Sequence, residues 1–364
     1  MKTADVKPDV FLSRLKKGQS RRECFAALLG ALEKPLADFG QGSFVGIKMT
    51  VGDEASTGFI KPELVRVLVE NLKSRGAKPF VFDTNVIYSG QRQNAVDHLN
   101  LAYRKGFTPD ALGCPYIIAD SVFGTDSRSV RTDFRHTKEI KVPSLITALD
   151  HLIVLSHVTG HVMSGFAGSV KNVAMGMASR AGKQIQHSSL KPYIKTDNCT
   201  LCGACIDHCP VSAIAEVSGK AYINSRICIG CCECISACKV DAVGINWKED
   251  ADIFAERMAE YACAILSLIR NRLFFNFALD VTRECDCIAG NDASIAPDTG
   301  IFVSLDVLAA DRACYDLLTT SRDIFSRGGK IRAHLHEFAY AEEIGLGKGS
   351  YRLIEVRKSG SGKE

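Results

Sequence analysis

The chain contains the sequence Cys199-Thr-Leu-Cys202-Gly-Ala-Cys205-Ile-Asp-His-Cys209-Pro210, and 29 residues later it contains Cys228-Ile-Gly-Cys231-Cys-Glu-Cys234-Ile-Ser-Ala-Cys238. In each copy two residues separate the first three cysteines, and three residues precede the fourth. Nine of the 15 cysteines in this 364-residue chain lie in this stretch. Disulfide scaffolds are short chains with evenly spread cysteines, so the clustering here indicates metal binding in a reducing compartment.

The cysteine spacing fits a cubane iron–sulfur cluster better than zinc. Two-residue gaps let one tight loop present three thiolates, while the fourth cysteine sits on the next helical turn and points away. A zinc site would use two pairs of ligands and would leave half of these cysteines unexplained. We therefore expect iron–sulfur clusters, and we interpret the additional Cys232 as a small residue of the loop rather than a ligand.

With these motifs the segment resembles the bacterial two-cluster ferredoxins, and all eight ligand positions are in register. In that family the fourth cysteine of each motif ligates the other cluster. The resemblance therefore implies two [4Fe–4S] clusters with crossed ligands. One cluster would be held by Cys199, Cys202, Cys205 and Cys238, and the other by Cys228, Cys231, Cys234 and Cys209. Lys239 follows the second motif where Pro210 follows the first, which leaves that turn less constrained.

Outside the cysteine motifs, β-branched or aromatic runs alternate with helical stretches. The strongest signal for a buried strand is at 151–157, and Pro62 marks the first turn of a helix that Gly76 ends. Further strands are expected at 43–51, 80–83, 116–120, 273–281 and 301–304, and helices at 62–75, 95–105, 145–149, 252–272 and 307–320. This alternation predicts an α/β domain with a mostly parallel sheet.

The cysteine segment interrupts the alternation, which resumes after it. The simplest interpretation is a two-cluster ferredoxin-like α+β domain inserted into one α/β domain. We expect the first part of the α/β domain at 1–190, the insertion at 191–248, the second part at 249–356 and a disordered tail at 357–364. Two separate α/β domains on either side of the segment are the alternative.

Charge and hydropathy exclude several classes of function. The 45 basic and 41 acidic residues are well mixed and leave a net charge of +4, without the basic run that indicates nucleic-acid binding. No stretch approaches the ~20 apolar residues of a membrane span. Residues 25–32 follow a basic stretch but lack a cleavage site, so we interpret them as an amphipathic helix. We expect a cytoplasmic protein with no membrane span and no nucleic-acid partner.

A glycine- and histidine-rich stretch, 157–187, follows the strongest strand and leads into the cysteine motifs. Ligands of open α/β sheets bind beyond the carboxyl ends of the strands, and basic residues there could hold a carboxylate or phosphate. The candidate catalytic residues are Lys171, Arg180, His157 and His161, and further candidates for substrate or a second metal are Asn172, Lys183 and His187. The alternative is a glycine-rich turn that enters an ordinary amphipathic helix with solvated basic residues.

A separate pair of cysteines, Cys285 and Cys287, follows the strand predicted at 273–281. Such a pair could supply thiolate ligands to a mononuclear metal or form a redox pair. The alternative is that both are ordinary buried cysteines, because free cysteine is among the most buried residue types.

Short motifs are spread along the rest of the chain. They are Lys61-Pro-Glu-Leu-Val65, Asp83-Thr-Asn85, Tyr88-Ser-Gly90, Asn94-Ala-Val-Asp-His98, Ser156-His157, Gly160-His161, Gly165-Phe-Ala-Gly168, Lys171-Asn172, Ser179-Arg180-Ala-Gly-Lys183 and Asp286-Cys287. In these motifs the chain resembles the microbial family called domain of unknown function 362 over most of residues 40–345. The resemblance implies an α/β architecture with a similar ferredoxin insertion. A fold-level likeness to lactate racemase implies a small-anion pocket.

Together these inferences predict an iron–sulfur oxidoreductase or electron-transfer subunit of anaerobic metabolism. Single electrons would pass between an external source, either a redox partner protein or a small electron donor, and a small anionic substrate in the α/β domain. Two other classes stay open. One is a non-catalytic carrier whose α/β domain binds a partner protein, and the other is a non-redox anion-binding isomerase with structural clusters.

Overall fold

The structure is a computed structural model that describes residues 6–88, 90–161, 163–187, 192–228, 234, 237–238, 240, 242–244, 247–287, 293–326 and 333–356. For 247–250 it describes the backbone alone. The predicted tail at 357–364 lies outside the described residues, as do Cys231 and Cys232 of the second cysteine motif.

An eight-stranded sheet in the order β16-β1-β15-β14-β7-β2-β3-β4 forms the centre of the protein. Its strands are β1 (Asp9–Arg14), β2 (Phe44–Lys48), β3 (Lys78–Asp83), β4 (Tyr116–Ile118), β7 (His151–His157), β14 (Asn271–Ala278), β15 (Gly300–Ser304) and β16 (Arg352–Glu355). The five strands from β14 to β4 are parallel to one another, and β1 is parallel to β16. Only β15 within this sheet runs antiparallel to both neighbours. The predicted α/β fold with a mostly parallel sheet is confirmed.

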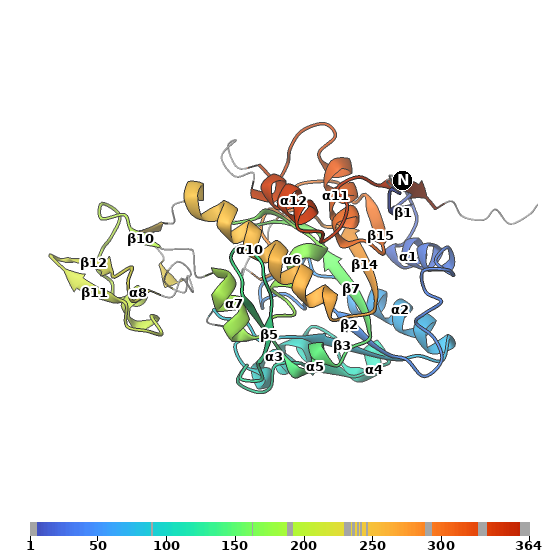
Figure 1. Ribbon diagram of the computed structural model, residues 1–364, viewed down its shortest axis with the longest axis horizontal. Coiled ribbons are helices and arrows are strands. Elements are labelled where there is room, and N and C mark those ends of the chain that lie inside the picture. The colour runs from blue at the N-terminus through green and yellow to red at the C-terminus, as the bar shows by residue number, and fades with distance from the viewer. Residues whose placement is uncertain are drawn as a thin grey trace, which may run out of the picture.

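Both faces of the central part of the sheet are buried, as the apolar sequence of β7 requires. Leu152 and Val154 pack on one side, while Ile153 and Leu155 pack on the other. Figure 1 shows helices α1 (Arg21–Gly30) and α2 (Pro62–Ser74) apart from α6 (Ser169–Ala174) and α10 (Trp247–Ser267). The first pair covers the Ile153 face, and the second pair covers the Leu152 face. Helices α11 (Val307–Leu318) and α12 (Ala333–Glu343) cover the end formed by β1 and β15.

Shorter elements complete the body. They are α3 (Ala95–Arg104), α4 (Pro109–Leu112), α5 (Ser144–Thr147), α7 (Arg180–His187) and the hairpins β5 (Arg128–Arg131) with β6 (Glu139–Val142) and β8 (Thr159–His161) with β9 (Gly165–Ala167). Helix α2 begins at Pro62. The N–H groups of a first helical turn have no carbonyl partner within the helix, so proline, which lacks an N–H, costs no hydrogen bond there. Helix α10 was predicted at 252–272 but ends at Ser267, because the chain there turns into β14.

The cysteine-rich segment projects from one end of the α/β body as a small lobe (Figure 1). The lobe contains β10 (Tyr193–Ile194) paired with β13 (Val243–Gly244), β11 (Ile214–Val217) paired with β12 (Lys220–Ile223), and α8 (Ala204–Asp207). The lobe follows α7 in the chain and precedes α10. Its small core is built from cysteine, alanine and β-branched residues.

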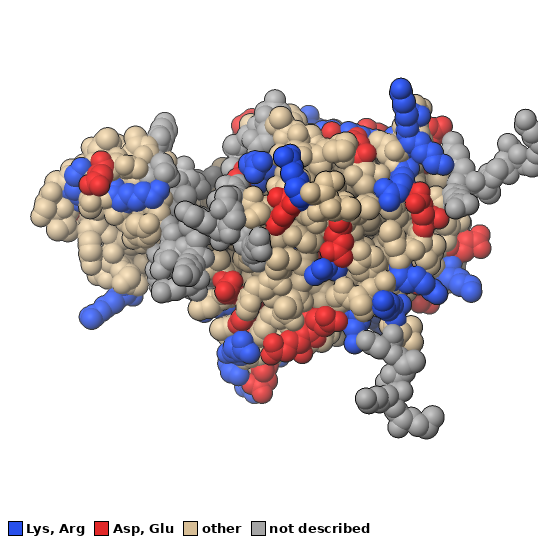
Figure 2. Space-filling model, turned by 90° about the horizontal axis from the view of Figure 1, so that it is seen from above, with Lys and Arg blue, Asp and Glu red and all other residues tan. Residues whose placement is uncertain are grey.

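Charges of both signs are interspersed over the face seen in Figure 2, as their mixing along the sequence predicts. None of the helices in the described part of the chain combines the length and apolar character that a membrane crossing requires.

Replacement of Phe25 by alanine should lower the free energy of unfolding by ~3–5 kcal/mol, because a fully buried aromatic side chain leaves a cavity. Phe25 is fully buried, and its ring centroid lies 5.5 Å from that of Phe275 and 5.1 Å from that of Phe277. Urea denaturation measures the change. Phe123 is 70% exposed, so Phe123→Ala is the matched control and should change stability little. Equal losses in the two variants would contradict the packing described here.

Candidate functional site

Three neighbouring parallel strands end on polar residues that lie at one edge of the sheet. Strand β2 ends at Lys48, β3 at Asp83 and β7 at His157. The carboxyl edge of an open α/β sheet is where such proteins bind ligands. All three side chains are buried, which is unusual for charged groups and requires that each has a partner.

Lys48 and Asp83 form an ion pair across β2 and β3. The Lys48 ammonium lies 3.1 Å from the Asp83 carboxylate and donates a 2.8 Å hydrogen bond to Asn172 Oδ1 from α6. Asn172 in turn donates to the Leu155 carbonyl and to Ser156 Oγ at the end of β7. Burial alone would raise the pKa of Asp83, but Lys48, Arg92 and the other groups around the carboxylate together hold that pKa below its usual value.

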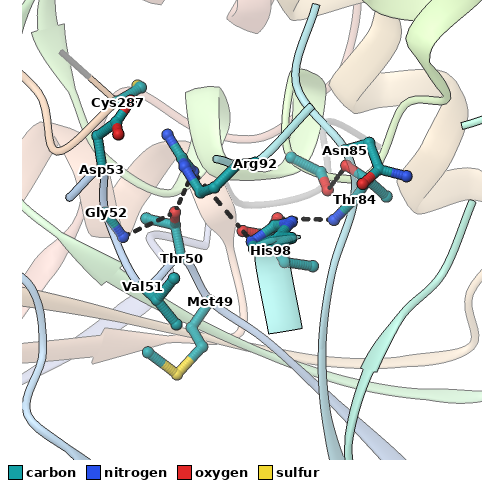
Figure 3. Close-up of polar contacts among 12 residues, drawn as sticks. Met49, Thr50, Val51, Gly52, Asp53, Thr84, Asn85, Arg92, His98 and Cys287 are labelled. Carbon is teal, nitrogen blue, oxygen red and sulfur yellow. Dashed lines mark hydrogen bonds and ion pairs between the residues drawn. The ribbon is translucent and has the colours of Figure 1, made fainter. Parts of the chain in front are cut away.

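Arg92 brings a second cation to Asp83. Its guanidinium donates to Thr50 Oγ1 (2.8 Å) and to the Tyr88 hydroxyl, and lies 4.0 Å from the Asp83 carboxylate. Figure 3 shows Arg92 between the 50–53 loop after β2 and the side chain of His98. Burial lowers the pKa of His98 to about 3, so this histidine is neutral near neutral pH. The fixed charges of this corner are therefore two cations and one carboxylate.

Lys183 from α7 approaches the same corner, and none of the acidic side chains that the structure describes forms an ion pair with it. Its ammonium donates to Thr84 Oγ1 (2.6 Å) and to the Ala178 carbonyl (2.7 Å). Burial lowers the pKa of Lys183 from 10.5 to about 8, although Asp120 and Asp83 act against that shift. Lys183 is therefore a buried ammonium that loses its proton easily.

His157 and Asp286 form a second buried pair. His157 Nδ1 lies 2.9 Å from Asp286 Oδ2, and His157 Nε2 lies 2.9 Å from the Leu279 carbonyl oxygen. A carbonyl and a carboxylate can only accept, so both ring nitrogens donate and the ring is charged. Burial would lower the pKa of His157, but Asp286 raises it. Ser56 also donates to Asp286, and the Asp53 amide donates to the Asp286 carbonyl, so the 50–56 loop is tied to this pair.

Cys285 and Cys287 lie on either side of Asp286, with their sulfurs 2.7 Å apart. The Lys171 ammonium from α6 donates to Cys287 Sγ at 3.5 Å. The hydrogen bond from Cys285 and the charge of Lys171 lower the pKa of Cys287, while the pKa of Cys285 rises well above its usual value. Cys287 is therefore the thiolate of the pair and Cys285 the thiol.

Three of the candidate residues predicted from the sequence do not take part in these buried pairs. His161 accepts backbone hydrogen bonds from Met163 and Ser164 on Nδ1, which is a structural role in the turn between β8 and β9. His187 donates to the Lys183 carbonyl, and burial lowers its pKa to about 4. Arg180 begins α7, and its side chain runs against Gly124. The candidates that come together are Lys171, Asn172, Lys183, His157, Cys285 and Cys287.

Sequence patterns missed Lys48, Asp83 and Arg92 as members of the site. Lys48 and Asp83 end their strands, and a charged residue at a strand end is usually solvated. Arg92 reaches the site through a loop whose path no periodicity describes. The available signal was that β2, β3 and β7 all end on charged residues, which parallel strands bring to one edge.

A second candidate site lies in the cysteine-rich lobe. One hollow there is lined by four cysteines, Cys199, Cys202, Cys205 and Cys238, together with Ile194, Leu201, Gly203, Val240 and other small or apolar residues. Three of the four cysteines come from the first motif and one from the second. Beyond the effect of burial, the other three cysteines raise the pKa of Cys205, as expected for sulfurs that face one space.

The two halves of the lobe repeat one local geometry. Cys209 Sγ accepts a hydrogen bond from the Ala213 amide at 3.1 Å, and Cys238 Sγ accepts one from the Ala242 amide at 3.2 Å. Of the second set, Cys209, Cys228 and Cys234 are described and Cys231 is not. No three His, Cys, Asp or Glu side chains among the described residues converge as a mononuclear metal site would need.

The fold and both sites can be compared with known proteins. The model of the family Domain of unknown function (DUF362) matches residues 45–316, so the chain belongs to that family. No curated protein matches it.

Two solved structures match the chain at 14% sequence identity. The lactate racemase apoprotein from Thermoanaerobacterium thermosaccharolyticum has a TM-score of 0.37, and the match covers 75% of this chain and 51% of that one. A structural-genomics protein from Thermotoga maritima has a TM-score of 0.43, with 80% and 58% covered. The chain therefore spans a little over half the length of these structures.

Replacement of Lys183 by methionine should change how stability depends on pH. The folded protein releases the Lys183 proton near pH 8, whereas the unfolded chain keeps it until about 10.5. Between these values the unfolded state binds more protons, so the free energy of unfolding rises with pH. In Lys183→Met the gain from pH 7.5 to 9.5 should be smaller by on the order of 1–2 kcal/mol in urea denaturation.

The control for this experiment is Lys138→Met, because the Lys138 side chain is 69% exposed. This variant should keep the pH dependence of the unchanged protein. If Lys183→Met keeps it as well, the lysine does not titrate as a buried ammonium.

Proposed function

We propose that this protein carries two [4Fe–4S] clusters in its cysteine-rich lobe and passes electrons to or from a small-anion site in its α/β domain. The observation that carries the proposal is the hollow lined by Cys199, Cys202, Cys205 and Cys238. The resemblance to two-cluster ferredoxins implies this same set of four thiolates for one cluster.

The residues around this hollow fit a cubane. Each thiolate of such a cluster binds a separate iron at one corner, so the four sulfurs surround a space and need not converge on a point. Hydrophobic neighbours such as Ile194 and Val243 limit water, and backbone amides that donate to sulfur stabilise its negative charge. When bound, the clusters would supply one-electron transfer.

The carboxyl edge of the sheet supports the other half of the proposal. Lys48, Arg92, Lys171 and Lys183 bring four cationic side chains to one buried region, and a carboxylate or phosphate would be bound there by charge-assisted hydrogen bonds. Cys285 and Cys287 add a group that can change oxidation state. A carrier without chemistry of its own would not need this arrangement, so an oxidoreductase is the better proposal.

Double cysteine variants test the clusters and their crossed ligands together. The unchanged protein, prepared without oxygen, should contain about eight irons. The pair Cys199→Ala with Cys238→Ala removes two ligands of the same proposed cluster, so about four irons should remain. The pair Cys228→Ala with Cys238→Ala removes one ligand from each cluster and should leave clearly fewer irons than the first pair.

Cys263→Ser is the control, because Cys263 lies in α10 outside the lobe, and it should keep all the iron. Iron analysis and electron paramagnetic resonance of the reduced protein give the result. The opposite order of iron losses would mean that each motif holds its own cluster. A folded protein without iron would refute the proposed function.

A further inference from the structure

The two sulfurs of Cys285 and Cys287 lie closer together than thiolates that share a metal ion. They are 2.7 Å apart, whereas two sulfurs bound tetrahedrally to one zinc lie about 3.8 Å apart. A disulfide bond measures about 2.05 Å, so a small movement separates this pair from a bond. The distance favours a redox pair over a metal site.

The surroundings give the two sulfurs different roles. The Lys171 ammonium lies beside Cys287 and stabilises a thiolate there. The pKa of Cys285 is raised, so Cys285 keeps its proton. Cys285 is 6% exposed, while Cys287 is partly exposed and accessible. One thiolate next to one thiol is the reduced form of a couple that forms and breaks disulfides.

A disulfide between these residues would add little to the stability of the fold. The loop that it closes has three residues, and the stabilisation from loop closure falls as the loop shortens. The loop is already fixed by His157 and Ser56, which bind Asp286, and by the Asp53 amide. Such a bond would serve oxidation and reduction rather than folding.

We propose that Cys285 and Cys287 form a reversible dithiol–disulfide couple that exchanges two electrons with the two iron–sulfur clusters, an inference that rests on the function proposed above. On reduction the sulfur–sulfur bond breaks and the pair takes up two electrons, one from each reduced cluster, and one proton from water. Cys285 becomes a thiol, and Cys287 becomes a thiolate beside Lys171. The couple thereby converts two one-electron steps into one two-electron group at the anion site.

A reductive titration counts these electrons. Protein with its iron–sulfur clusters is oxidised with diamide without oxygen, freed of reagent and titrated with dithionite. The unchanged protein should take up about four electrons per chain, two for the clusters and two for the disulfide. Cys287→Ser should take up about two with the same iron content. Cys263→Ser, which alters a cysteine of α10, should take up about four.

Peptide masses identify the bond. Trypsin releases residues 284–312, whose only cysteines are Cys285 and Cys287, and residues 258–270, whose only cysteine is Cys263. In the oxidised protein the first peptide should resist alkylation and be two hydrogens lighter than the reduced peptide. The second should be alkylated in both states.

The outcomes separate this inference from the function that it extends. If all three proteins bind about eight irons and take up only two electrons, the couple does not exist but the clusters do. If the unchanged protein has no iron, still takes up two electrons and shows the disulfide in the 284–312 peptide, the couple exists without clusters. That result would refute both the exchange with clusters and the proposed function.

The variant Lys171→Met tests whether Lys171 stabilises the Cys287 thiolate. The readout is the rate of Cys287 alkylation, which a purely structural role of Lys171 would not change. Loss of the ammonium should raise the pKa of the Cys287 thiol above about 5, and the rate of alkylation of reduced Cys287 by iodoacetamide at pH 5 should fall about fivefold for a shift of one unit. Lys138→Met is the control and should react at the unchanged rate. Equal rates in the three proteins would mean that Lys171 does not hold the thiolate.

Discussion

A buried cation needs a counter-charge, and this requirement organises the carboxyl edge of the sheet. Lys48 is paired with Asp83, His157 with Asp286, and Lys171 with Cys287. Removal of one partner from a buried pair leaves an uncompensated charge, which costs about 3–5 kcal/mol. Each pair joins elements that are distant in the chain, so the charges fix how the strands, α6 and the 285–287 loop meet.

The sequence contained enough to predict the centre of the sheet. The limits of β7 agree with the prediction because an uninterrupted apolar run can only be satisfied by burial on both faces. Strands β16 and β1, at one edge of the sheet, were not predicted. β16 is mostly exposed, and β1 pairs with β15 and β16 from the far end of the chain, so neither has a strong local pattern. The antiparallel direction of β15 follows from its connection to β14, because the described part of that connection contains no crossover helix.

The candidate site was only partly predictable, for a physical reason. Lys171, Asn172 and Lys183 follow the strongest strand within a glycine-rich stretch, so their position at the carboxyl edge could be inferred. Their partners belong to β2, β3 and the loop that carries Arg92, and which charges meet is decided by strand order, which local periodicity does not encode. The same limit explains why His161, close to His157 in sequence, serves a turn instead.

The charge balance would also connect the proposed electron transfer to anion binding. In the reduced pair Cys287 supplies the negative charge that Lys171 requires. Oxidation to a disulfide would remove that charge from beside Lys171, in a region that also contains Lys48 and Arg92 next to Asp83. An anion would then bind the oxidised form more tightly than the reduced form. Linkage is reciprocal, so the bound anion would stabilise the disulfide and make it harder to reduce, and arrival of electrons would favour release of the anion.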